Sequence, residues 1–469
     1  MKIGELRKKY PEFIYKEYSY ELRKGDFHIS FDFAVPARLA SESVAGGGEI
    51  KFHPHIVIKN VPQGLLSRVK QPLDNLIFHL GLAEMPSYWK TTASPKIIVE
   101  AGALNKQQVN WWHDLFMNGM GQFFYENKID FTKKNFLTVE SKRGARTNVF
   151  TKKLSNKILV PIGGGKDAIV TLELLKNTKL ETRGFLLNPK KEQMKILKIA
   201  GQKNPVIVER TIDPKLLELN RKGYLNGHTP FSAYLAFVTA LCASLFDYKY
   251  IAFSNERSSN EGNVEYLGHT VNHQYSKSFD FEKRFRAYSK KYLASELEYF
   301  SFLRPLYELQ IAKLFSRYPQ YFKAFLSCNE AHKTASATKR PTGEWCCKCS
   351  KCLFVFASLY PFREEKQLIK IFGSNLFHDK TLIPLMKELV GERNFKPFEC
   401  VGTTKESLVA FYLSLRKTHP PLPALLKHFR QHTVKKHPNL FSSTRSILVS
   451  WNKRHFLAPR LAKLLQENV

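Results

Sequence analysis

The sequence predicts an α/β fold, a doubly wound parallel sheet with an α+β unit before it and a helical region after it. Two observations support this prediction. Strand-like and helix-like segments alternate between residues 157 and 256, and strands separated by helices of this length are typical of a parallel sheet. Outside that stretch the pattern differs, because residues 1–60 alternate with the period of a strand and most other apolar spacing is helical.

The length of 469 residues exceeds what one core usually serves, so two or three domains are expected. We predict an N-terminal α+β domain over residues 1–150, a central α/β domain over 151–360 and a helical, basic C-terminal region over 361–469. Because 43% of the residues are hydrophobic, the chain has enough apolar material for ordinary globular folding.

The N-terminal domain combines both periods. The segments "FHISFDFAV" (27–35) and "IKFHPHIVI" (50–58) predict strands, and the three glycines at 46–48 predict a hairpin turn between them. From about residue 71 to 127 the spacing is mostly helical. The polar stretch 139–157 is expected to be a linker to the central domain.

The central domain alternates regularly. Strands are predicted over 157–162, 181–188, 205–210 and 248–256, and helices over 167–177, 194–202 and 230–246. The apolar run 231–246 is 16 residues long and falls short of the roughly 20 that span a bilayer, so we expect a buried helix. The N-terminus has no secretory signal pattern. We therefore expect a cytoplasmic protein without a membrane span.

The formal net charge of +32 fits a nucleic-acid binder or an enzyme of anionic small molecules. Residues 403–469 alone hold twelve Lys and Arg against two Glu, a net of +10. These charges alternate with apolar residues at helical spacing, which favours the solvated faces of amphipathic helices. No nucleic-acid partner is therefore expected, and the oligomeric state is not predicted.

A glycine-rich turn, "ILVPIGGGKDA" (158–168), joins the first central strand to its helix. A Walker loop would need glycine where Val160 stands and a hydroxyl where Asp167 stands. A dinucleotide fingerprint matches nominally, but the second strand ends in Asn188 instead of an acidic residue. The remaining interpretation is the S-G-G-x-D-S loop of the PP-loop enzymes that split ATP into AMP and pyrophosphate.

The residue types of this loop suit an ATP phosphate. The amides of Gly163, Gly164 and Gly165 can form an anion-binding nest at a helix N-terminus. Lys166 can pair with a phosphate, and Asp167 can bind Mg²⁺ or cap the helix. The structural alternative is a tight turn between strand and helix without a ligand.

Four cysteines have the spacing of a metal site. Cys346, Cys349 and Cys352 form C-x2-C-x2-C, and Cys328 precedes them by eighteen residues. Four thiolates at such spacing suit a structural Zn²⁺ site or an iron–sulfur cluster, and zinc is favoured because nothing else in the sequence indicates redox chemistry. Cys347 is expected to be outside the ligand set.

Several segments occur in one order: "LVPIGGGKDA", "LNGHTP", "SNERSSNEGN", "VNHQYSKS", "SCNE", "WCCKCSKCLFVF" and "KPFECVG". In this order they resemble the ATP-dependent UDP-N-acetylmuramoyl-L-alanyl-L-glutamate epimerase family of peptidoglycan synthesis, over residues 157–402. The resemblance implies a PP-loop ATP pyrophosphatase domain over 151–360. One position departs from the family, since its loop usually ends in GGGKDS and Ala168 lacks that hydroxyl.

The resemblance implies a reaction that uses ATP and Mg²⁺. ATP adenylates the terminal glutamate carboxylate of a UDP-linked muramoyl dipeptide, pyrophosphate leaves, and the neutral acyl group acidifies the α-proton. A base and an acid on opposite faces then invert the carbon, and hydrolysis releases AMP and the D-Glu product.

The sequence does not identify the acid and the base. Cys400 and His228 are candidates beside Lys166 and Asp167, and His273, Glu256 and Glu399 are further ones. Contacts with ATP or a carboxylate are expected from four residues after the loop: Asn255, Glu256, Arg257 and Lys277.

Two other functions fit parts of the sequence. A tRNA-modifying or other PP-loop pyrophosphatase would use the same loop with an adenylated intermediate, and the net charge would suit RNA. A non-catalytic relative would explain Ala168, but the retained Lys166 and Asp167 disfavour it.

Overall fold

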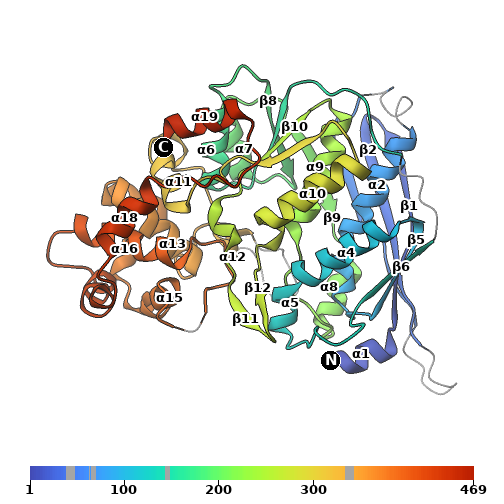
Figure 1. The fold of residues 1–469 in the computed structure, drawn as a ribbon, viewed down its shortest axis with the longest axis horizontal. Helices are drawn as coiled ribbons and strands as arrows, with labels where there is room; N and C mark the ends of the chain where they lie inside the picture. The colour runs from blue at the N-terminus through green and yellow to red at the C-terminus, as the bar shows by residue number, and fades with distance from the viewer. Residues whose placement is uncertain (39–47, 63, 65–69, 143–147, 333–342, 394) are drawn as a thin grey trace.

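One continuous β-sheet organises the protein (Figure 1). The computed structural model describes residues 1–38, 48–62, 64, 70–142, 148–332, 343–393 and 395–469. In these residues the sheet has eleven strands, in the order β13-β10-β7-β8-β9-β4-β2-β1-β5-β6, with β3 paired to β2. The strands of this sheet are β1 (Glu12–Arg23), β2 (Asp26–Val35), β3 (Ile50–Phe52), β4 (His55–Ile58), β5 (Lys96–Ala103), β6 (Thr138–Lys142), β7 (Ile158–Pro161), β8 (Thr182–Leu187), β9 (Val206–Thr211), β10 (Tyr250–Phe253) and β13 (Glu298–Ser301).

The five strands from β13 to β9 run parallel to one another. In chain order β7 comes first and lies in the middle, with β8 and β9 added on one side and β10 and β13 on the other. This is a doubly wound arrangement, whose ligand crevice lies where the strand order reverses, here between the carboxyl ends of β7 and β10. The predicted α/β class with a largely parallel sheet is confirmed, and the PP-loop type stays a prediction.

Each predicted element of the central domain has a counterpart in the structure. The predicted strands correspond to β7, β8, β9 and β10. The predicted helices correspond to α6 (Lys166–Leu175), α7 (Lys191–Ile199) and α9 (Phe231–Leu245). Nearly every residue of α9 is buried, which explains its apolar sequence without a membrane. In the described part of the chain, none of the helices combines the length and apolar composition needed to cross a bilayer.

Two predictions on the first 157 residues were wrong in part. The stretch 71–127, predicted to be mostly helical, also contains β5, whose Ile97 and Val99 alternate into the core. The predicted linker 139–157 contributes most of β6, which pairs with β5 at the sheet edge. β5 lies between helical stretches and β6 lies in a polar stretch, so an average over a wider window conceals both strands. The predicted glycine turn at 46–48 lies largely outside the described residues.

The first half of the chain is joined to the second by strand pairing. β4 pairs antiparallel with β9, placing Ile58 opposite Val208. One buried apolar cluster runs from Leu6 to Tyr299 and a second from Ile158 to Leu465. Residue 150 therefore does not separate two cores. The helices of this half and of the first cluster are α1 (Ile3–Lys9), α2 (Lys70–Glu84), α3 (Pro86–Trp89), α4 (Lys106–Gly119), α5 (Gly121–Glu126), α8 (Pro214–Arg221) and α10 (Phe279–Tyr292).

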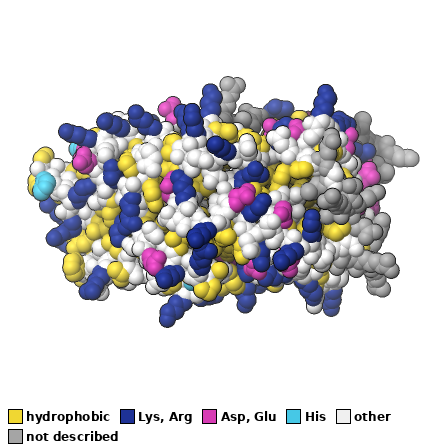
Figure 2. All heavy atoms as spheres, turned by 90° about the horizontal axis from the view of Figure 1, so that it is seen from above, with side chains coloured by type: hydrophobic (Ala, Val, Ile, Leu, Met, Phe, Trp, Pro, Cys, Tyr) yellow, Lys and Arg dark blue, Asp and Glu magenta, His cyan; other side chains and the backbone are white. Residues whose placement is uncertain are grey.

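The chain beyond β13 is helical in its described residues, and its C-terminal helices lie at the end of the molecule opposite β1, β5 and β6 (Figure 1). Figure 2 shows Lys and Arg side chains spread over the coloured part of the visible face, without a single gathered patch. The helices are α11 (Glu308–Phe315), α12 (Asn329–His332), α13 (Ser350–Leu359), α14 (Glu365–Phe372), α15 (Ile383–Leu389), α16 (Thr404–Lys417), α17 (Ala424–His428), α18 (Leu440–Leu448) and α19 (Pro459–Asn468).

A buried ion pair crosses between the two halves and gives a test of this arrangement. Arg210 of β9 donates from Nε and Nη2 to Glu84 of α2, at 3.0 and 2.6 Å, and the Glu84 side chain is 1% exposed. Glu84→Gln leaves a buried guanidinium without its counter-charge, so the free energy of unfolding should fall by about 3–5 kcal/mol.

Urea unfolding followed by circular dichroism measures this loss. Glu100→Gln is the matched control, because its ion pair with Lys16 is 40% exposed on both sides and should contribute about 1 kcal/mol or less. Equal effects of the two substitutions would contradict the prediction.

Candidate active site

The glycine loop follows β7 at the point where the strand order reverses, and it leads directly into α6. Gly164 has φ of +88°, and a Cβ there would lie 3.3 Å from the carbonyl oxygen of Leu326. The Leu326 amide donates to the Gly164 carbonyl at 2.9 Å, so the loop packs on the segment just before Cys328. Among the described residues no side chain caps α6 at Gly165, so its first amides are available to an anion.

The side chain of Lys166 turns inward to two carboxylates. It is 1% exposed, its Nζ lies 2.5 Å from Asp167 Oδ1, and it also donates to Glu308 at the start of α11. Burial lowers the pKa of Lys166, but Asp167 and Glu308 outweigh it and raise this pKa above its ordinary value. Burial raises the pKa of Glu308, and Lys166 and Lys351 outweigh it, so this carboxyl is ionised with a lowered pKa.

The loop after β10 brings Asn255 and Glu256 to the same crevice. The Asn255 amide donates to Ser301 Oγ at 3.1 Å. Glu256 is buried, and this burial, together with the charges of Glu308 and Asp167, raises its pKa to about 7. A carboxyl group with that pKa can hold or release a proton near neutral pH.

Arg257, predicted to contact phosphate or carboxylate, has other partners. Its guanidinium lies 4.3 Å from the centre of the Tyr307 ring and donates to Ser450 Oγ at 2.8 Å. A contact between Arg257 and a ligand would have to replace these interactions, so its predicted role stays a prediction.

Lys277 and Cys400 form a direct pair. Lys277 Nζ lies 3.1 Å from Cys400 Sγ, although 123 residues separate them in the chain. Burial raises the pKa of the Cys400 thiol, but the charges of Lys277 and Lys351 outweigh it and hold this pKa below its ordinary value. Conversely, Cys400 and Glu256 raise the pKa of Lys277 despite its burial. The pair therefore favours a thiolate next to an ammonium group.

His228 and His273 lie together at the edge of this group, with ring centres 6.1 Å apart. Burial, His273 and Lys277 lower the pKa of His228 to about 3, and burial also lowers the pKa of His273 strongly. His273 Nδ1 meets Asn263 Oδ1 at 2.9 Å. His228 Nδ1 and His273 Nε2 are buried without a hydrogen-bond partner among the described residues, so two neutral imidazoles have unused polar atoms.

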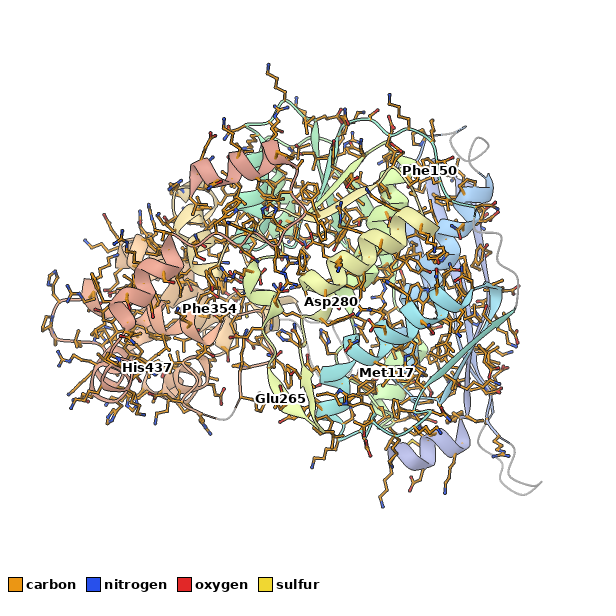
Figure 3. The ribbon with its side chains drawn as sticks, viewed as in Figure 1. Met117, Phe150, Glu265, Asp280, Phe354 and His437 are labelled. Carbon is orange, nitrogen blue, oxygen red and sulfur yellow. The ribbon has the colours of Figure 1, made fainter. Side chains whose placement is uncertain are left out.

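Three further residues of the site, Lys351, Glu308 and Arg304, were not predicted from the sequence. Lys351 of α13 donates to the carbonyl of Cys400 and lies 3.6 Å from Glu308 Oε1. Direct contacts thus run from Lys166 through Glu308, Lys351 and Cys400 to Lys277. In Figure 3 the label Phe354 marks α13, the helix that carries Lys351, and the label Asp280 marks α10.

The third unpredicted residue, Arg304, lies behind the site and is fully buried. Its Nη1 donates to the carbonyl of Glu256 at 2.7 Å and its Nη2 to the carbonyl of Lys277 at 2.5 Å. Glu282 of α10 balances its charge at 3.0 Å. Glu308 and Arg304 follow β13, a strand that the sequence interpretation did not include, and recognising that strand would have located both.

The four predicted metal ligands converge. The Sγ atoms of Cys328, Cys346, Cys349 and Cys352 all lie within 4.8 Å of one another. The cluster is adjacent to the crevice, because Lys351 lies between two of its members in the chain. Cys347 lies outside it, with its Sγ 3.1 Å from the carbonyl oxygen of Phe372.

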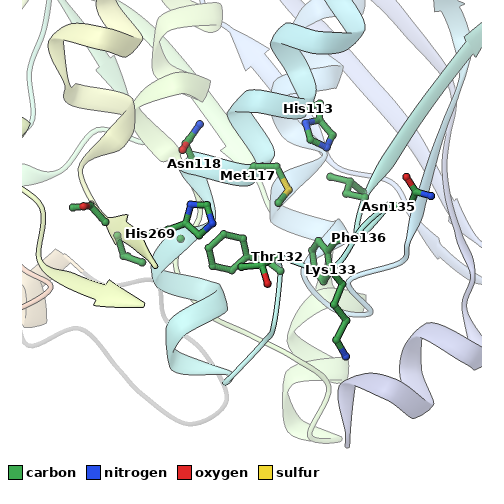
Figure 4. A pocket seen from close by; sticks show the side chains of 13 residues that line it. His113, Met117, Asn118, Thr132, Lys133, Asn135, Phe136 and His269 are labelled. Carbon is green, nitrogen blue, oxygen red and sulfur yellow. The ribbon is translucent and has the colours of Figure 1, made fainter. Parts of the chain in front are cut away.

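A cavity of ≈ 670 Å³ lies between α4, the 131–137 segment and β12 (His269–Val271) (Figure 4). His113, Met117 and His269 line it, and β12 pairs with β11 (Val264–Tyr266). None of the predicted site residues lines this cavity. The predicted site residues therefore lie outside this cavity.

Residues 5–302 match the MurL N-terminal domain, and residues 324–440 match the MurL C-terminal domain. Three curated relatives bear the name UDP-N-acetyl-alpha-D-muramoyl-L-alanyl-L-glutamate epimerase.

The relative from Micromonospora sp. is 32% identical over 413 residues, covering 87% of this chain and 88% of the relative. The relative from Xanthomonas oryzae pv. oryzae is 32% identical over 346 residues, or 73% and 75% of the two chains. The relative from Salinispora tropica is 31% identical over 411 residues, or 87% and 86%. With the first domain match alone covering more than half of its residues, the chain belongs to the MurL family.

Proposed function

We propose that this protein is an ATP-dependent epimerase that converts the terminal L-Glu of UDP-N-acetylmuramoyl-L-alanyl-L-glutamate to D-Glu in peptidoglycan synthesis. Relatives named for this epimerase align with most of the chain. The observation that supports the chemistry most directly is the buried series of contacts from Lys166 to Lys277 beside the glycine loop. Because the substrate is a UDP-linked precursor, we also propose a cytoplasmic location.

The glycine loop is the proposed ATP site. An ATP phosphate would meet the uncapped amides of α6, and Lys166 would exchange a carboxylate partner for a phosphate oxygen. Asp167 and Glu308 offer the oxygen ligands that Mg²⁺ prefers, and the ion would supply charge neutralisation for the phosphates. Ala168 is buried in the core, so a serine hydroxyl at this position is not required for the loop to fold.

Adenylation explains why an epimerase would need ATP. The α-proton next to an ionised carboxylate is very weakly acidic, because its removal would place a carbanion beside an anion. Attack of the carboxylate on the α-phosphate of ATP gives an acyl-adenylate and pyrophosphate. The acyl carbonyl can then accept the electron pair left by the proton, and water later cleaves the mixed anhydride to AMP and product.

Proton transfer is assigned to Cys400 and Glu256. Lys277 keeps Cys400 available as a thiolate, which can remove the α-proton. Glu256, with its pKa raised to about 7, can hold the proton that is returned on the other face. The neutral His228 and His273 are assigned to substrate hydrogen bonds, since their lowered pKa values make them weak bases.

The first prediction is the reaction itself. Purified protein with ATP, Mg²⁺ and UDP-N-acetylmuramoyl-L-alanyl-L-glutamate should form D-Glu, AMP and pyrophosphate. Chiral chromatography of the hydrolysed product and AMP quantification measure this. Formation of AMP with tRNA only, or D-Glu without ATP, would contradict the proposal.

Lys166→Met should lower AMP formation by about 100-fold or more, because it removes the buried ammonium that is proposed to meet the phosphates. Lys176→Met is the matched control, since Lys176 follows α6, is 37% exposed and pairs with Glu173. The control should retain near-full activity, and equal losses in both variants would refute the phosphate role.

Cys400→Ser should reduce D-Glu formation by about 100-fold or more while pyrophosphate release continues, because adenylation precedes proton removal. Lys277 lowers the pKa of Cys400, so Lys277→Met should raise this pKa. The acid side of the pH–rate profile for D-Glu formation should therefore move to higher pH. Cys347→Ser serves as the thiol control. Parallel loss of both activities in Cys400→Ser would mean that Cys400 does not act in proton transfer.

A further inference from the structure

The four converging sulfurs have the dimensions of a single-ion site. Cys349 Sγ and Cys352 Sγ are 3.5 Å apart, and Cys346 Sγ and Cys352 Sγ are 3.8 Å apart. A Zn–S bond is about 2.3 Å, which makes the edge of a ZnS₄ tetrahedron about 3.8 Å. An iron–sulfur cluster is several atoms across and would hold its thiolates farther apart. The geometry therefore fits one tetrahedral ion.

The local backbone also suits thiolate ligands. Cys349 is the N-cap of α13, and its Sγ accepts from the Cys352 amide at 3.5 Å. The Lys348 amide lies 3.5 Å from Cys346 Sγ in the same way. Amides that donate to sulfur stabilise negative charge on a metal-bound thiolate. Cys347, with φ of +58°, turns its thiol away from this cluster.

Lys351 links this cluster to the candidate active site. It lies in the first turn of α13 between Cys349 and Cys352, and its side chain is 5% exposed. Its amide donates to Glu399, and its Nζ contacts Glu308 and the Cys400 carbonyl. A shift of the first turn of α13 would move all three contacts together.

We propose that the four cysteines hold one zinc ion, and that this ion fixes the first turn of α13 so that Lys351 holds Glu308 and Cys400 in place. Lys351 is then a positioning residue, because it contacts Cys400, the proposed base, at the backbone carbonyl and not at the thiol. The ion performs no step of the proposed reaction. This inference goes beyond the proposed function, and its test needs neither ATP nor the muramoyl substrate.

Metal content tests the ligand set with adjacent cysteines. Elemental analysis should find one zinc per full-length chain. Cys346→Ser should lose at least half of it, whereas Cys347→Ser should keep all of it. Protein loaded with Co²⁺ should show the intense visible bands of a tetrahedral thiolate site. Equal zinc in the two variants, no zinc in the wild-type protein, or the brown absorption of iron–sulfur would overturn the metal assignment.

The alkylation rate of Cys400 tests the positioning role. The charged groups that face this thiol come from five segments, and they are Lys277, Lys351, Glu256, Glu308 and Glu399. Because Lys351 helps to lower the pKa of Cys400, Lys351→Met should move the midpoint of its iodoacetamide pH profile upward while one zinc stays bound. Lys351→Arg should restore part of the shift.

Loss of zinc should have the same effect as loss of Lys351. Peptide mass spectrometry of Cys400 should show the upward midpoint shift in Cys346→Ser and no shift in Cys347→Ser. If Cys346→Ser is insoluble, removal of zinc from the wild-type protein by a chelator replaces it. An unchanged Cys400 profile after zinc removal or in Lys351→Met would overturn the positioning role. Both outcomes are independent of whether D-Glu is formed.

Discussion

The buried guanidinium of Arg304 is the interaction on which the geometry of the crevice depends. It binds the backbone of two segments that are not adjacent in the chain, at Glu256 and at Lys277, and it is neutralised by Glu282. If either carbonyl moved away, the buried guanidinium would lose a hydrogen-bond acceptor inside the protein. A hydrogen bond to a charged group contributes about 1.5–3 kcal/mol. The positions of the Glu256 carboxyl and the Lys277 ammonium therefore depend on Arg304, which binds the backbone of both residues but not their charged groups.

The charges in front of Arg304 follow a second constraint, which is alternation of sign. Cations at Lys166, Lys351 and Lys277 are separated by Glu308 and by the Cys400 thiol. Lys166, Glu308, Lys277 and Cys400 keep their ionised forms because a neighbour of opposite charge offsets the cost of burial. The titration of one group consequently depends on the others, and an anionic ligand entering the crevice would change several pKa values together. Glu256, whose pKa is raised to about 7, changes its protonation state close to neutral pH.

The sequence sufficed for those features whose signal is local. The glycine loop, the alternating elements of the central domain and the cysteine spacing are contained in short windows, and the structure has a counterpart for each. Glu308, Lys351 and Arg304 could not be found in this way, because they join the loop only through the order of strands in the sheet. The strands β5 and β6 were missed for a different reason, since they lie among helical and polar stretches and are recognised as strands by their pairing in the sheet.

The pairing of β4 with β9 has a consequence for how the chain folds. His55 lies opposite Thr211, so β4 has an unpaired edge until more than 150 further residues have been made. Open strand edges attract other chains, and contacts between distant segments form slowly. A ribosome-bound chain that ends before β9 would therefore expose an unpaired strand edge that is prone to aggregation. We expect such a chain to need chaperones until β9 and the parallel strands have been added.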